Sequence, residues 1–362
     1  MKPRGYIPVA VLAAVLAAFQ LLVSFTGQEF FLTQLTMSAY YVLAVMGLCL
    51  LMGYAGQISL GHAAFFAIGG YTAAVLGTFN AAPYQDGAVV RLLLKTGLAS
   101  ASDAATVHVS PWAALGLAVL LALAVSVVIG VPILRLRGHY LAMATLGFGL
   151  IVHRIVLGTH IFGEADGISD LPAFPLFAGL SVSGRPELRV SNYYIAWTIV
   201  VLGMALLLNL VNSRPGRALR AIHDNEEAAR AMGVDTARYK LNVFVLSAVF
   251  TAVAGVFLTH FNAGIGPAEA DVMKSVRYVA IVAVGGMANL WGALAMGLSL
   301  NYISLRGYLG SYDDAFFGAV LILIMIFAPE GLLNAERPRA ILGQVKALAA
   351  RMRKKGGEGG AP

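Results

Sequence analysis

Long apolar runs separated by short polar segments form the pattern of this chain. A helix of about 20 apolar residues crosses the hydrocarbon core of a bilayer. On this basis we predict crossing helices at 7–26, 31–52, 58–79, 111–134, 141–162, 192–211, 241–261 and 315–328. The region 275–305 is also apolar, but Gly285, Gly286 and Asn289 interrupt it. The pattern therefore predicts an all-α polytopic membrane protein.

The basic residues indicate which ends of these helices face the cytoplasm. Lys and Arg gather in cytoplasmic segments; here they lie before the first run, just after the fourth, in 214–240 and from 337 to 355. Placing all four groups inside requires an even number of crossings, so 275–305 counts as two helices joined near 285–291. We expect about ten transmembrane helices, with the N- and C-termini both cytoplasmic. The alternative, one long tilted helix over 275–305, would put the basic tail outside.

This topology divides the chain into three parts. Residues 1–30 hold the N-terminal cytoplasmic end and the first transmembrane helix, 31–333 form the main membrane domain, and 334–362 form a basic cytoplasmic tail. The first run is longer than a usual signal-peptide core and lacks a clean cleavage site, so we expect a retained helix rather than a signal peptide. Within the tail, 339–353 suits either a helix lying on the anionic inner leaflet or a frayed end.

Composition supports the membrane class and excludes other functions. Hydrophobic residues make up 59% of the 362 residues and charged residues 12%, whereas soluble domains carry about 25% charged residues. The net charge of +7 comes from the cytoplasmic segments, so no nucleic-acid partner is expected. A lone Cys49 excludes an intramolecular disulfide. The sequence contains no His-Glu-x-x-His zinc motif, no Gly-x-Ser-x-Gly elbow and no phosphate-binding loop. We therefore predict no enzyme, no metal and no cofactor.

Few ionisable residues lie inside the predicted spans. The candidates for a functional role are His62, His153, Arg154 and Arg277, and the acidic pair 313–314 stands at the mouth of the last span. A buried acid is the usual mark of a proton-driven carrier, and the predicted spans hold none. This pattern disfavours an ion-coupled or passive carrier or channel that acts alone, the main alternative function.

A polar, glycine-rich stretch offers candidates for a solute path. Gln57, Ser59 and His62 lie among glycines, which let backbone and polar atoms face a cavity. A simple packing interface is the other interpretation. Segments 56–65 and 286–295 share a rhythm of small residues, a faint sign of the repeats from which many transporters are built.

The only long charged stretch between apolar runs, 213–240, predicts a short cytoplasmic helix. Asp224 or Asn225 suits the N-cap, and Glu226 and Glu227 suit the first turn, where negative charge favours the helix dipole. Gly233 suits the position just after the helix. A helix of two turns is marginal alone. Docking into a groove of another protein would explain it, and a loop that packs on its own bundle is the alternative.

Within this helix, Glu227-Ala228-Ala229 followed by Gly233 resembles the coupling helix of ABC importer permeases, which sits in a cleft of the ATPase subunit. The alanines and Met232 give the helix a small, apolar surface. The flanking basic residues are expected to hold it against the membrane; they are Arg217, Arg220, Arg238 and Lys240. By this resemblance 213–240 is the cytoplasmic coupling loop. The implied ATPase-coupling residues are Asp224, Asn225, Glu226, Glu227, Ala228, Ala229, Arg230 and Gly233.

Further motifs resemble one family, the LivM-type permeases of branched-chain amino acid importers, over most of 40–333. They are GYAGQISLGHAAFFAIGGYTAA (53–74), LRLRGHYLAMATLGFG (134–149), the stretch 217–256, VGGMANLWGALAMG (284–297) and FAPEGLL (327–333). The resemblance implies a type II ABC importer permease bundle in the bacterial inner membrane. It also implies a second, LivH-like permease, two ABC ATPase subunits, a periplasmic substrate-binding protein and a small-molecule solute as partners, besides membrane lipid.

Two departures from the family pattern bear on the solute. Leu150 and His153 stand where the family usually has Glu and Arg, and FGEADGI (162–168) replaces a stretch with two adjacent glycines. The cargo is therefore a branched-chain amino acid or a related small polar solute such as urea, a short amide or an aromatic acid. The sequence also leaves open whether the permease pair is homomeric or mixed.

Overall fold

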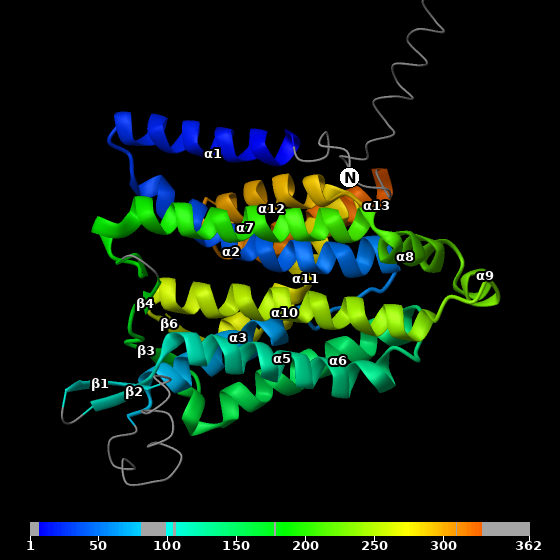
Figure 1. Ribbon diagram of the computed structural model, residues 1–362, viewed down its shortest axis with the longest axis horizontal. Coiled ribbons are helices and arrows are strands. Elements are labelled where there is room, and N and C mark those ends of the chain that lie inside the picture. Colours follow the sequence, from blue (N-terminus) through cyan, green and yellow to red (C-terminus); the bar gives the residue numbers. More distant parts are fainter. Residues whose placement is uncertain (1–6, 81–98, 104–105, 177–178, 309, 328–362) are drawn as a thin grey trace, which may run out of the picture.

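The computed structural model describes residues 7–80, 99–103, 106–176, 179–308 and 310–327. Most of them form helices that run side by side in one bundle (Figure 1). These helices are α1 (Ile7–Phe25), α2 (Phe30–Cys49), α3 (His62–Thr78), α5 (Pro111–Ile133), α6 (His139–Gly158), α7 (Arg189–Asn212), α10 (Thr236–Asn262), α11 (Val272–Gly285), α12 (Leu290–Leu305) and α13 (Asp313–Phe327). Each of the eight predicted spans corresponds to one of them and the region 275–305 to two, which confirms the all-α polytopic class.

Six helices among the described residues are long and apolar enough to cross a membrane by themselves. They lie at Ile7–Phe25, Phe30–Tyr54, Pro111–Ile133, His139–Gly158, Pro186–Asn212 and Thr236–Asn262. The second joins α2 to the π-helical turn η2 (Leu50–Tyr54). The helices α3, α11, α12 and α13 are shorter, so a count of ten transmembrane helices stays a prediction. The predicted tail helix at 339–353 lies outside the described residues.

The region 275–305 contains two helices, and a single tilted helix there is wrong. α11 ends at Gly285 and α12 begins at Leu290. Gly286, with φ +97°, turns the chain between them. The two helices pack closely against each other: a Cβ atom at Gly285 would lie 2.6 Å from the backbone of Gly292.

Short elements gather at the two ends of the bundle (Figure 1). At one end, which we call the hairpin end, lie three antiparallel pairs: β1 (Ala99–Asp103) with β2 (Thr106–Val109), β3 (Ile168–Ser169) with β6 (Gly264–Ile265), and β4 (Phe174–Pro175) with β5 (Ser181–Val182). At the other end, α8 (Arg214–Asp224) and α9 (Glu226–Ala231) project beyond the bundle. The 3-10 turns are η4 (His160–Phe162), η5 (Pro186–Leu188), η6 (Pro267–Ala270) and η7 (Gly310–Tyr312).

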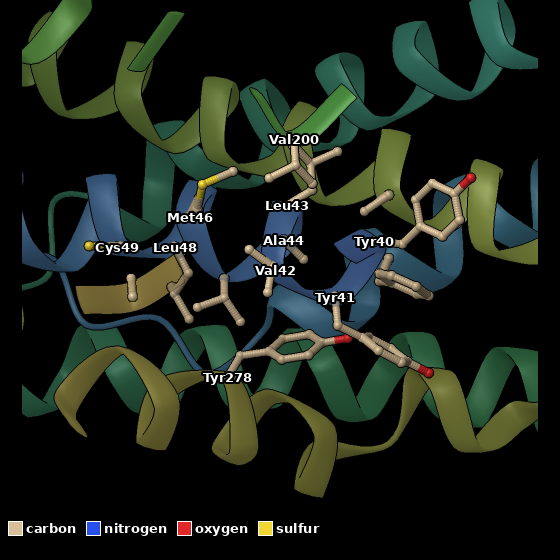
Figure 2. Packing of buried hydrophobic residues seen from close by; sticks show 14 of the residues in the cluster. Tyr40, Tyr41, Val42, Leu43, Ala44, Met46, Leu48, Cys49, Val200 and Tyr278 are labelled. Atoms are coloured by element: carbon tan, nitrogen blue, oxygen red, sulfur yellow. The ribbon is translucent and has the colours of Figure 1, made fainter. Parts of the chain in front are cut away.

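The core is built around α2. In the apolar 18-residue window of its membrane-length segment 94% of the residues are buried, against 22% in that of α1 and 28% in those of α5 and α6. The outer helices therefore keep broad apolar faces, which suits contact with lipid or with another membrane protein. Figure 2 shows how Tyr41, Leu43 and Met46 of α2 pack against neighbours such as Val200 of α7 and Tyr278 of α11.

Glycines bring the backbones of α3 and α10 into contact. A Cβ atom at Gly69 would lie 2.1 Å from the carbonyl oxygen of Ala252, and one at Gly255 would lie 2.1 Å from that of Phe66. No side chain fits at such a distance, and small residues of this kind drive helix packing inside membranes. These two glycines therefore fix the separation of the two helices.

Two helix breaks interrupt the bundle, and the second of them touches the end of the α2–η2 segment that precedes the first. Residues 55–61 separate η2 from α3, so α3 begins later than the predicted run 58–79, because Gly56 at φ +67° turns the chain out of the helix. The second break is the turn 286–289. A Cβ atom at Gly53 would overlap the carbonyl oxygen of Met287 at 1.4 Å, and the thiol of Cys49 lies 3.4 Å from the same oxygen. The two segments with a similar rhythm of small residues thus include the breaks.

Candidate coupling helix and solute site

The short helix α9 has a structural cap at each end. The side chain of Asn225 accepts hydrogen bonds of 3.0 Å from the backbone N–H groups of Glu227 and Ala228. At the other end Gly233 has φ +83°; its N–H donates to Arg230 O at 3.0 Å, and the next N–H donates to Ala229 O at 3.1 Å. This pair of bonds is a Schellman motif. The predicted helix and its Gly233 terminus are confirmed, and of the two N-cap candidates Asn225 is the cap.

One face of α9 is exposed and the other is not. Glu227, Ala228 and Ala231 are exposed, and the side chain of Met232 is 86% exposed. Ala229, expected on the same apolar surface, is only 5% exposed and faces its own chain. The expectation for Ala229 is therefore wrong, because a helix of two turns resting on the bundle must turn one side inward. That the exposed residues of α9 contact an ATPase subunit stays a prediction.

A partly buried ion pair ties α9 to α10. The carboxylate of Glu226 accepts hydrogen bonds of 3.0 and 3.1 Å from Lys240, and Arg230 and Thr236 also donate to it at 3.2 Å. Lys240 was expected to flank the loop against the membrane, but its side chain is only 9% exposed. Burial opposes ionisation of Glu226, but Lys240, with help from Thr236 and Arg137, outweighs it and lowers the pKa of this carboxyl group. The ion pair therefore stabilises the fold fully above the ordinary glutamate pKa, and this contribution is lost as the pH falls through the lowered value.

Changing Glu226 to glutamine should lower the thermal stability of the detergent-solubilised protein. The charge of Lys240 would stay buried without its carboxylate, a loss of about 3 kcal/mol. Glu227→Gln is the matched control, because Glu227 pairs with Arg137 at 3.2 Å with both side chains more than half exposed and its loss should cost below about 1 kcal/mol. Adding Lys240→Met to Glu226→Gln should recover most of the melting temperature. Equal melting temperatures for the two single variants would show that the Glu226–Lys240 ion pair does not stabilise the fold.

A cleft of ≈ 330 Å³ lies between the coupling loop and the first helix break. Asp224, Glu226 and Lys240 line it from the loop side, and Gln57 lines it from the break. The ring of His223 lies against Gly56, where a Cβ atom would come within 2.7 Å of Nδ1. The coupling loop therefore touches the 55–61 segment directly.

The three candidate path residues fall into two environments. His62 is fully buried, with Nδ1 3.0 Å from Ser59 Oγ and Nε2 2.6 Å from Ser247 Oγ on α10. These contacts join α3 to α10 and involve both ring nitrogens. Gln57 is 2% exposed, and neither atom of its amide group has a partner among the described residues. Ser59 and His62 thus lie in a packed network, Gln57 lies apart at the cleft, and the path role of all three stays a prediction.

A charged cluster near the hairpin end was missed by the sequence analysis. Glu269 of η6 pairs with Lys274 of α11 at 3.0 Å, and Tyr41 of α2 donates to Glu269 at 2.8 Å. The five-residue spacing of Glu269 and Lys274 gives a weak local signal, but Tyr41 lies 228 residues from Glu269 in the sequence. Arg277 had been singled out without a partner; it pairs with Asp313 at 3.2 Å and with Asp314 at 2.9 Å.

Metal chemistry has no support in the described part of the chain. No group of three or more His, Cys, Asp or Glu side chains gathers there in a way that could hold a metal ion. The candidate site has three parts. It combines an exposed, capped helix, an ion pair beneath it and polar side chains inside the bundle.

Comparisons with known proteins identify the family. Residues 30–325 match the family described as branched-chain amino acid transport system / permease component. The chain is 32% identical over 335 residues to the high-affinity branched-chain amino acid transport system permease protein LivM of Salmonella typhimurium, covering 86% of this chain and 72% of that protein. It is 26% identical to LivH of Escherichia coli (83% and 92% covered) and 24% identical to BraD of Pseudomonas aeruginosa (83% and 93%). No solved structure matches the chain. Because the family matches from α2 to α13 and the three relatives named here are permease proteins, the chain belongs to the branched-chain amino acid transport system permease components.

Proposed function

We propose that the chain is the membrane-spanning permease subunit of an ATP-driven ABC importer that moves branched-chain amino acids inward. Its family and its LivM, LivH and BraD relatives support this function. The observation that carries the coupling role is α9, a capped helix that projects beyond the bundle and exposes Glu227, Ala228 and Met232. An exposed apolar face on so short a helix fits a groove on a partner protein.

The proposed assembly follows from the family. The chain pairs with a second permease, LivH-like or identical, and each permease receives one ATPase subunit at its α9. A periplasmic substrate-binding protein delivers the solute at the hairpin end. The chain then lies in the bacterial inner membrane as a bundle of about ten crossing helices, with both termini on the α8–α9 side. Figure 1 agrees with this arrangement, because α1 begins and α13 ends on that side.

Two contacts give the mechanism a physical route. ATP binding closes the ATPase pair and moves α9. The Glu226–Lys240 ion pair carries this motion to the start of α10, and the contact of His223 with Gly56 carries it to the 55–61 break. Both elements adjoin the packed network of His62, so a shift of α9 changes how α3 and α10 meet. The bundle opens inward, and the solute passes between the two permeases.

The test of this function is affinity purification of the tagged chain in mild detergent. We expect two ATPase subunits and a second permease to copurify with the natural chain and to be lost from the Glu227→Lys, Gly233→Trp variant. The membrane content of the variant is the control for folding. A chain that purifies alone, yet moves solute when reconstituted in vesicles, would instead support a carrier that works without an ATPase. Competition of leucine uptake by urea, short amides and aromatic acids then decides the cargo.

A further inference from the structure

The missed charged cluster has a closed geometry centred on Glu269. Lys274 Nζ donates to Glu269 Oε1 at 3.0 Å and to the Tyr41 hydroxyl at 3.1 Å, and that hydroxyl donates to the same oxygen at 2.8 Å. The ammonium of Lys274 also lies 4.7 Å from the centre of the Tyr41 ring. The side chains of Glu269 and Lys274 are 19% and 21% exposed, so the pair is enclosed but reachable.

Polar atoms around Glu269, Lys274 and Tyr41 lack hydrogen-bond partners among the described residues. Glu269 Oε2 and the hydroxyl groups of Tyr71 and Tyr278 are buried and have no partner among the described residues. Both tyrosines are at most 2% exposed, and both phenols interact electrostatically with Glu269. Leaving buried polar groups unpaired is costly, so each such group calls for an explanation. One acceptor oxygen and two hydroxyl donors thus lie around one ion pair, and none of the three has a hydrogen-bond partner among the described residues.

An apolar cavity adjoins the cluster through Tyr71. The cavity has a volume of ≈ 440 Å³, and its walls come from α3, α5 and α6. Ile68, Tyr71, Phe148, Val152, Ile155 and Phe162 line it. Tyr71 therefore borders the cavity and also lies in one hydrophobic cluster with Ala270, the residue next to Glu269. A small ligand with a charged head and a branched aliphatic tail matches both parts.

We propose that Glu269, Lys274, Tyr41, Tyr71 and Tyr278 form a binding site for a zwitterionic aliphatic amino acid within the permease itself. The ligand ammonium group binds the free Oε2 of Glu269. Its carboxylate accepts hydrogen bonds from Lys274 and from the hydroxyl groups of Tyr71 and Tyr278, and its side chain enters the apolar cavity. This site deepens the proposed function and rests on it, because it names where the transported solute is held inside the bundle.

A purely structural role explains only part of the cluster. An ion pair that fixes η6 to α2 accounts for the contacts of Glu269 Oε1 and of Lys274. It does not account for the unpartnered Oε2 or for the two unpartnered hydroxyl groups. These atoms also permit a specific test, because removing a hydroxyl group that has no hydrogen-bond partner among the described residues breaks no hydrogen bond among them.

The test is a titration of the importer complex, purified without its binding protein in lipid nanodiscs, with L-leucine by isothermal calorimetry. We expect saturable binding that becomes about tenfold weaker in Tyr278→Phe, the usual effect of losing one hydrogen bond to a charged group. Tyr40→Phe is the matched control: the Tyr40 hydroxyl group is also buried without a partner among the described residues, but the ring packs on Phe257 at 6.1 Å, and Figure 2 shows it pointing away from Tyr41 and Tyr278. It should bind leucine like the natural chain.

Leucine analogues complete the experiment. 3-Methylbutylamine lacks the carboxylate and 4-methylpentanoate lacks the ammonium group, and each should bind at least about tenfold more weakly than leucine. Absence of leucine binding, or equal binding by Tyr278→Phe and the natural chain, overturns the site. Recovery of ATPases in the purification experiment with no leucine binding refutes the site alone. Tyr278-dependent leucine binding by a chain that recovers no ATPase refutes the ATP-driven function and keeps the site.

Discussion

A tryptophan in place of Ala228 should abolish solute uptake while leaving the bundle folded. Ala228 is exposed on the outer face of α9, so an indole ring there extends into solvent but obstructs any groove shaped for a small side chain. Loss of a central contact of this kind weakens association by about 2–4 kcal/mol. Uptake of labelled leucine by cells that express the variant measures the effect.

The control for this variant is Ala237→Trp. Ala237 is also an exposed alanine in a helix, but it lies at the start of α10 rather than on α9. Both variants should reach the membrane at the level of the natural chain and melt at the same temperature. Undiminished uptake by the Ala228→Trp variant would remove α9 from the coupling mechanism.

Valine in place of Gly255 should prevent the chain from accumulating in the membrane. Its Cβ atom would lie 2.1 Å from the carbonyl oxygen of Phe66 and 3.1 Å from the backbone nitrogen of Gly70. Both atoms belong to the backbone of α3, so neither can rotate away, and α3 must separate from α10 over its length. Overpacking in a tight core costs about 3 kcal/mol or more, and here it also disturbs the His62–Ser247 contact. Quantitative immunoblotting of membranes and thermal unfolding measure the outcome.

Gly147→Val is the matched control for this second variant. Gly147 lies inside α6, and a Cβ atom there meets nothing within 4 Å among the described residues. The two variants share the same small cost of a β-branched residue in a helix, so the difference between them isolates the contact of α3 with α10. A Gly255→Val chain as abundant and as stable as Gly147→Val would show that the two backbones do not touch.

Features that depend on local sequence could be predicted. Apolar runs specify helices wherever they occur, because lipid leaves no other way to satisfy the backbone. The turn between α11 and α12 follows from Gly285 and Gly286, and the termini of α9 follow from Asn225 and Gly233. Each of these signals acts through neighbouring residues, so the spacing in the sequence contains the information. Membership of the permease family also follows from several such motifs in order.

Features that depend on which helices pack together could not be predicted. The partner of His62 on α10 lies 185 residues away, and that of Tyr41 on η6 lies 228 residues away. The inward orientation of Ala229 and the burial of Lys240 depend on how α9 rests on α10, which no local pattern specifies. The predicted spans contain no acidic residue. The acid found inside the bundle, Glu269, lies in a connecting segment that only the fold brings there.

The contact of α2 with the turn 286–289 has a consequence for biosynthesis. Cys49 and Met287, which meet there, are 238 residues apart. At ribosomal rates of 5–20 residues per second, α12 emerges about 10–50 s after α2. The most enclosed helix of the mature bundle therefore resides in the bilayer through most of translation without its final neighbour, with the π-helical turn Leu50–Tyr54 at its end. Protection of that turn during this interval is a task for lipid or for the insertion machinery rather than for the chain itself.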